Sequence, residues 1–145
     1  MLPSRRIAFG LLAAVWLAAT VVVSHAAPGA QQPAQQVKST LIGVYLEEQA
    51  AKGQEDYMNI CVGCHATGTY IGKVFAQMFE KRPVADLFEF LITKMPKDDP
   101  GSLSPKESAE LVAYLLKINK VPAGQVALPE DPAALTKIVV ELPAR

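Results

Sequence analysis

The stretch that decides the fold is Cys61-Val62-Gly63-Cys64-His65, which holds both cysteines of the 145-residue chain and one of its two histidines. On a helical turn, positions i, i+3 and i+4 lie on one face, so two sulfurs and an imidazole can meet one flat ring. The spacing C-x-x-C-H indicates covalent attachment of one c-type haem, through thioethers to Cys61 and Cys64 and an iron bond to His65.

Three other interpretations use the same residues. A thioredoxin-like dithiol belongs at a strand–helix junction of a βαβ unit, whereas a helical pattern leads into Cys61. A zinc site needs four ligands, and Cys61, Cys64 and His65 supply three. A structural disulfide suits an oxidising compartment but leaves His65 without a role.

The N-terminus has the composition of a secretory signal peptide, predicted over residues 1–26. Arg5 and Arg6 precede an apolar run over residues 7–23, and small residues follow it. An uncleaved membrane anchor is the alternative, because the apolar run reaches the lower end of the spanning range. Cleavage would leave a periplasmic protein with no membrane span.

Composition limits the remaining chain to one modest domain with extensions. The fourteen basic and fourteen acidic residues balance, so bulk charge does not favour nucleic-acid binding. Residues 27–43 are rich in Gln, Pro and Ala and predict a flexible leader, with order beginning near Val44. Residues 44–121 predict a mainly α domain. Residues 122–145 form a Pro-rich C-terminal extension, in which 137–142 predict a short strand or an extended segment.

Four segments of the domain are predicted to be helical, and the first three are residues 47–60, 74–79 and 84–94. Residues 47–60 have apolar and small residues at spacings of three and four, and Gly53 predicts close contact with another helix, covered by Tyr57. Residues 74–79 predict a short helix. Residues 84–94 have one apolar face.

The last helix has a clear start, and the helix before it has a clear end. Pro96 disfavours helical backbone at Met95 and should end the helix there. Ser104 and Glu107 predict a capping box with Pro105 at the first helical position, so the last helix should run to about residue 119.

Met95 is the predicted second iron ligand. With the signal peptide removed, His65 is the only histidine, which leaves Met58, Met78 and Met95. Met58 lies on the helix before the motif, and Met78 lies in an apolar run where methionine is usually core. Met95 stands at a helix end before Pro96, where a loop can present its thioether; an open or lysine-bound site is the other alternative. His/Met ligation raises the reduction potential and fills both axial positions, which favours electron transfer over oxygen chemistry.

These residues together resemble the class I c-type cytochromes over about residues 45–121. Gly53, Tyr57 and the C-x-x-C-H motif look like the N-terminal helix and attachment site of that family, and Met95-Pro96 looks like its axial methionine. The resemblance implies a small cytochrome c-like helical domain around a covalent haem, with an extended leader and a Pro-rich tail.

A narrower likeness extends through residues 100–104, 113–119 and 122–129. These segments are similar to small bacterial cytochromes that serve periplasmic dehydrogenases, including quinoprotein alcohol dehydrogenases. The similarity implies redox-protein partners, such as a quinoprotein dehydrogenase and a terminal oxidase or another cytochrome.

One departure from the family concerns the axial histidine. Many members follow the attachment site with a Gly-Pro pair whose carbonyl orients that histidine. Here Gly68 is followed by Thr69 and Gly72 by Lys73. The group that binds the Nδ1 proton of His65 is therefore open.

The predicted function is one-electron transfer by a monohaem carrier, not an enzyme, so no catalytic residue is predicted. Basic residues flank the expected haem edge and could steer an acidic partner or be ordinary solvated side chains: Lys73, Lys81, Arg82, Lys94 and Lys97. Two alternatives are a cytochrome subunit bound stably in a periplasmic dehydrogenase complex, and a haem protein with a vacant iron site for gas binding or peroxidase chemistry.

Overall fold

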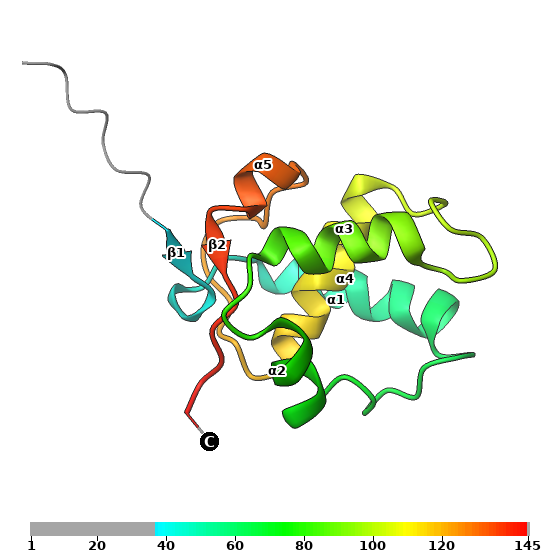
Figure 1. Cartoon of the computed structure of the whole chain (residues 1–145), viewed down its shortest axis with the longest axis horizontal. Helices are drawn as coiled ribbons and strands as arrows, with labels where there is room; N and C mark the ends of the chain where they lie inside the picture. Colours follow the sequence, from blue (N-terminus) through cyan, green and yellow to red (C-terminus); the bar gives the residue numbers. More distant parts are fainter. Residues whose placement is uncertain (1–36, 145) are drawn as a thin grey trace, which may run out of the picture. The chain divides into compact units, whose positions relative to one another are not determined.

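The computed structural model describes residues 37–144. The predicted signal peptide and most of the predicted leader lie outside these residues. Helices α1 (Glu47–Asp56), α3 (Val84–Lys94) and α4 (Pro105–Ile118) lie together in the middle of the fold, and α2 (Lys73–Phe79) lies at its edge (Figure 1). The mainly α fold predicted from the sequence is confirmed. No helix among residues 37–144 is both long enough and apolar enough to cross a membrane.

The contact between α1 and α4 is the most extensive helix–helix contact in the structure. The two backbones touch at Gly53, where an added Cβ would stand 1.8 Å from the carbonyl oxygen of Glu110. One turn later the ring of Tyr57 lies against Tyr114, with centroids 5.3 Å apart and planes tilted by 52°. Only a residue without a side chain allows this approach, so the predicted role of Gly53 is confirmed.

The predicted start of α4 and end of α3 are confirmed as well. The Ser104 hydroxyl accepts a hydrogen bond from the Glu107 N–H at 3.2 Å, and the Glu107 carboxylate accepts one from the Ser104 N–H at 2.8 Å. Helix α3 ends at Lys94, and Met95 has extended backbone angles, as a following proline requires.

The helix that leads into the cysteines is less regular than its sequence pattern predicts. After α1 the chain continues as one π-helical turn, η2 (Tyr57–Cys61), in which the Val62 N–H donates to the Tyr57 carbonyl at 3.0 Å. Such wider turns inside helices are frequent at functional sites.

Regular structure begins earlier in the chain than the sequence predicts. Strand β1 (Lys38–Ser39) pairs in parallel with β2 (Ile138–Val139), and a 3₁₀ turn, η1 (Thr40–Ile42), follows β1. The predicted flexible leader extended to residue 43, but the hydroxyl of buried Thr40 donates to the Glu141 carbonyl at 2.6 Å and accepts from the Glu141 N–H at 2.9 Å. These contacts, made to the far end of the chain, order residues 38–42.

The C-terminal extension also contributes to the core. It contains a short helix, α5 (Pro132–Leu135), which the sequence does not predict and which Asp131 caps. The side-chain amide of Gln49 bonds both the N–H and the carbonyl of Leu128. Three apolar side chains of the extension are fully buried: Leu128, Leu135 and Val140.

Candidate haem site

An apolar cavity of about 320 Å³ lies beside the C-x-x-C-H motif, a volume typical of cofactor pockets. The four residues predicted to hold haem, Cys61, Cys64, His65 and Met95, all line it. Its walls come from η2 and the loop after it, from α2, α3 and α4, and from the loop after α3. Most of the remaining lining is apolar or aromatic: Phe75, Phe79, Leu87, Phe90, Leu91, Leu103, Leu111 and Leu115.

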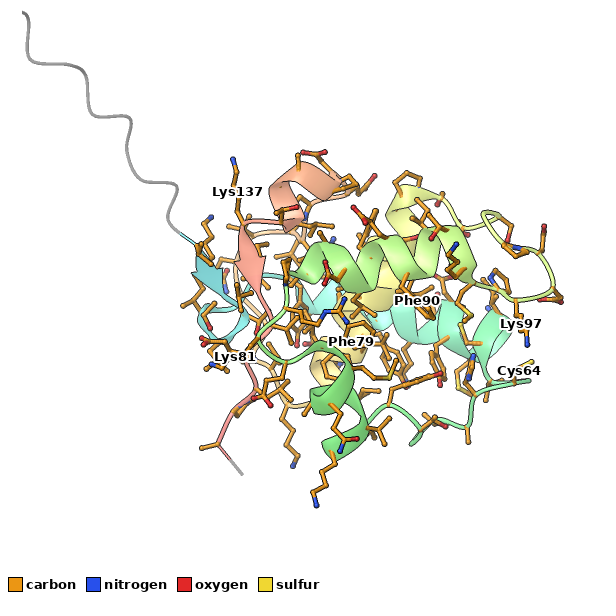
Figure 2. The ribbon with its side chains drawn as sticks, viewed as in Figure 1. Cys64, Phe79, Lys81, Phe90, Lys97 and Lys137 are labelled. Atoms are coloured by element: carbon orange, nitrogen blue, oxygen red, sulfur yellow. The ribbon has the colours of Figure 1, made fainter. Side chains whose placement is uncertain are left out.

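A tight turn brings the three motif residues to the cavity. The N–H groups of Cys64 and His65 both donate to the carbonyl of Cys61, at 3.1 and 2.9 Å. Cys64 is exposed and Cys61 is partly buried, and both thiols are free. Figure 2 shows Cys64 near Lys97 of the loop after α3, and both residues line the cavity.

Burial, with a smaller contribution from the charge of Asp56, raises the pKa of the Cys61 thiol. A redox-active dithiol of the thioredoxin type instead lowers the pKa of its attacking cysteine. The motif also follows a helical turn, not a strand. The local structure therefore lacks the two features that the dithiol interpretation requires.

Two methionines face the cavity from segments outside the motif. Met95, at the end of α3, and Met78, on α2, both line it. Met58 is 48% exposed and is not among the lining residues. The geometry therefore leaves Met95 and Met78 as the sulfur ligands that the cavity offers from outside the motif.

Two tyrosines hold His65. The Tyr57 hydroxyl donates to the carbonyls of His65 and Ala66, at 3.0 and 3.3 Å. The Tyr70 hydroxyl lies 3.1 Å from His65 Nδ1, with ring centroids 5.3 Å apart and planes tilted by 60°. Sequence reasoning leaves the partner of Nδ1 open. The one feature of the sequence that could have indicated this partner is the tyrosine five residues after His65.

The loop that carries Tyr70 is fastened to the end of α4 by one side chain. The Asn119 amide donates to the carbonyls of Tyr70 and Leu115, both at 2.8 Å, and its oxygen accepts from the Gly72 N–H at 2.8 Å. Asn119 is only 8% exposed. Both polar atoms of its side-chain amide have partners within the protein, as buried polar groups usually do.

The chemistry of the cavity fits a flat apolar group with a metal at its centre. Two thiols and an imidazole lie on one adjoining stretch, thioethers come from other segments, and apolar side chains fill the walls between them. Phe90 and Ile60 line the cavity while 40% and 37% of their surfaces remain exposed, which leaves apolar area available to a bound ring. Thiol, imidazole and thioether are the side-chain groups that hold haem c.

The predicted basic residues do not gather at the cavity. Of the five, Lys97 lines it, next to Asp98. Lys81 pairs with Glu141 at 2.6 Å and Arg82 with Asp86 at 2.7 Å. Figure 2 shows Lys81 well away from Cys64. Within residues 37–144, no group of three or more His, Cys, Asp or Glu side chains is arranged to hold a metal ion.

Comparison with known proteins identifies a family resemblance over the central helices. Residues 48–115 match the family model described as Cytochrome C oxidase, cbb3-type, subunit III. The match supports a c-type cytochrome. No curated protein and no solved structure matches the chain.

The matched segment includes the C-x-x-C-H motif, Tyr70 and Met95. Together with the helices described above, it supports a small, mainly α domain that is similar to cytochrome c. The similarity supports a role in haem-based electron transfer. The match gives no support for the predicted similarity to cytochromes that serve quinoprotein dehydrogenases.

Proposed function

We propose that this chain is a monohaem electron carrier of the periplasm, with haem c attached to Cys61 and Cys64 and its iron held by His65 and Met95. The observation that carries the proposal is the convergence of these four side chains on one apolar cavity within the cytochrome c-like domain. Export through the predicted signal peptide, residues 1–26, is part of the proposal, because haem c attachment takes place outside the cytoplasm.

Bound haem c would supply a one-electron couple at iron. The residues of this chain would bind and surround the group. Cys61 and Cys64 would hold the group to the turn after η2, and His65 and Met95 would bind its iron. The apolar walls would exclude water from the bound group, which together with a thioether ligand would favour the reduced state. Electron transfer of this kind needs no general acid or base.

Local structure favours Met95 over Met78 as the axial thioether. A residue inside a helix has its side-chain direction restricted by the preceding turn, which applies to Met78, the next-to-last residue of α2. Met95 follows the last residue of α3 in extended conformation and is partly buried. Its thioether, which lines the cavity, is therefore free of the restriction that a helix interior imposes.

The test compares Met95→Leu with the matched variant Met78→Leu by visible spectroscopy in both redox states. We expect Met95→Leu to lose the ferric methionine charge-transfer band and to bind carbon monoxide rapidly when reduced, while Met78→Leu keeps the wild-type spectrum. A wild-type spectrum from Met95→Leu would show that the ligand assignment is wrong. Rapid carbon monoxide binding by the wild type would favour the alternative of a vacant iron site.

A second candidate function is a haem subunit held in a respiratory complex. The observation that favours it is the matched family model, whose description names an oxidase subunit. A quinoprotein dehydrogenase as donor, proposed from the sequence resemblance, would instead place the chain in a dehydrogenase complex. Purification of the native chain with a large catalytic subunit would support a bound subunit, and a monomer on sizing would support a free carrier.

A further inference from the structure

The imidazole of His65 has one polar neighbour that acts on the ring itself. Among residues 37–144, the Tyr70 hydroxyl is the polar atom found at hydrogen-bond distance from Nδ1, at 3.1 Å. The other contacts of this residue, from Tyr57 and Cys61, are to its backbone. They fix where the residue lies but leave the rotation of the ring free.

We propose that Tyr70 is the positioning residue of His65, an inference that rests on the proposed function. If Nε2 binds the iron, Nδ1 carries the proton of the neutral imidazole and donates it. The Tyr70 oxygen then accepts this hydrogen bond, in the place where many class I cytochromes have a backbone carbonyl.

The position of Tyr70 is set by the fold and not by its own loop. Asn119 of the α4 end bonds the Tyr70 carbonyl and the Gly72 N–H, and a third bond to Leu115 anchors the amide on α4. The loop therefore cannot move away from α4 without leaving a buried amide unsatisfied, which is costly. The phenol is thus held beside the imidazole by a residue 49 positions later in the chain.

This hydrogen bond has an electronic consequence. An acceptor on Nδ1–H makes the imidazole a stronger donor to the metal, and stronger donation stabilises the ferric state. Removing the acceptor should shift the equilibrium toward the ferrous state, by up to about tenfold, and tenfold corresponds to 59 mV for one electron.

The experiment measures the midpoint potential of the holoprotein for Tyr70→Phe and for the matched control Tyr45→Phe. Both variants lose one tyrosine hydroxyl, but the Tyr45 hydroxyl bonds the Val121 carbonyl and Tyr45 does not line the cavity. We expect a higher potential for Tyr70→Phe and an unchanged one for Tyr45→Phe. Equal potentials in Tyr70→Phe and the wild type would overturn the proposal.

A measurement on the wild type keeps the proposal testable if Tyr70→Phe does not fold. In the reduced protein, the Nδ1–H resonance of His65 should show magnetisation transfer to the Tyr70 ring protons; its absence would overturn the proposal. A wild type with no covalent haem would instead contradict the proposed function. A wild type with haem c and a methionine band, but no link between His65 and Tyr70, would contradict only the role of Tyr70.

Discussion

The two ends of the described structure are stabilised in different ways. At the end where β1 meets β2, which we call the terminal clamp (residues 38–45 and 121–141), polar groups bond one another within the chain. Thr40 bonds Glu141 in both directions, and the Tyr45 hydroxyl donates to the Val121 carbonyl at 2.7 Å. At the cavity end, the two cysteines of the motif are free thiols, and some of the apolar side chains that line the cavity with them are partly exposed.

This difference indicates that the two ends depend on different interactions for their stability. The terminal clamp is held by contacts within the protein, whereas the cavity end has apolar area, thiols, an imidazole and thioethers that a further group could contact. A domain of this size buries a limited apolar core. We therefore expect haem attachment to stabilise the cavity end, and the terminal clamp to hold together the two ends of the described segment, residues 37–144, regardless of haem.

The largest expected effect distinguishes two glycines, one at each end. Gly124 touches Gly43, where an added Cβ would stand 2.1 Å from the Gly43 carbonyl oxygen, whereas an added Cβ at Gly68 meets nothing within 4 Å. We expect Gly124→Ala to lower the free energy of unfolding by about 3 kcal/mol, since backbone must move. Gly68→Ala should change it by less than about 0.5 kcal/mol.

Denaturant unfolding of both holoprotein variants checks this prediction. Equal stability of Gly124→Ala and Gly68→Ala would contradict the tight contact between Gly124 and Gly43.

The sequence shows the cavity end far better than the terminal clamp. Three local sequence patterns each predict a local structure: C-x-x-C-H, the capping box of Ser104 and Glu107, and Gly53. They were sufficient to predict α1, α3 and α4 and to bring the motif residues toward Met95. The matched family model covers this same part of the chain.

The terminal clamp has no comparable local signal. Its strands are two residues long, so no alternation can develop, and Thr40 acquires its role only when Glu141, 101 positions away, reaches it. Helix α5 is one turn long and too short for a helical period. Tyr70 is the corresponding case at the cavity, because its placement depends on Asn119 folding the loop back onto α4.

A smaller effect is expected from the buried hydroxyl of the terminal clamp. Thr40→Val keeps the shape but leaves the Glu141 N–H and carbonyl without a partner, which should cost about 2 kcal/mol. Thr69→Val, at an exposed position of the cavity loop, is the control and should be nearly neutral. Thermal unfolding of the two variants measures the difference. Equal melting temperatures would mean that the Thr40 bonds are unimportant.

The smallest effect concerns the crossing of α1 and α4, which connects the two ends. Burial raises the pKa of Glu110; nearby Lys106 and Lys52 lower it, and Asp56 and Glu107 raise it further. The folded state therefore binds the Glu110 proton more tightly than the unfolded state. Stability rises as the pH falls through the raised pKa, the gain is complete below the ordinary carboxyl pKa, and it is lost as the pH rises again through the raised pKa. We expect Glu110→Gln to increase stability at pH 7 by less than about 1 kcal/mol.

Unfolding measured between pH 4 and 7 checks this prediction. Glu110→Gln should gain less stability on acidification than the wild type does. An identical pH dependence would place the titrating group elsewhere, with Asp56, whose pKa burial also raises, as the next candidate.

The central claim is that haem is covalently attached at Cys61 and Cys64, and the intact mass of the protein purified after expression with haem c maturation tests it most directly. We expect the mass of the chain from residue 27 plus one haem for the wild type, and the mass of the bare chain for the double variant Cys61→Ala/Cys64→Ala. A wild-type mass equal to that of the bare processed chain would contradict it.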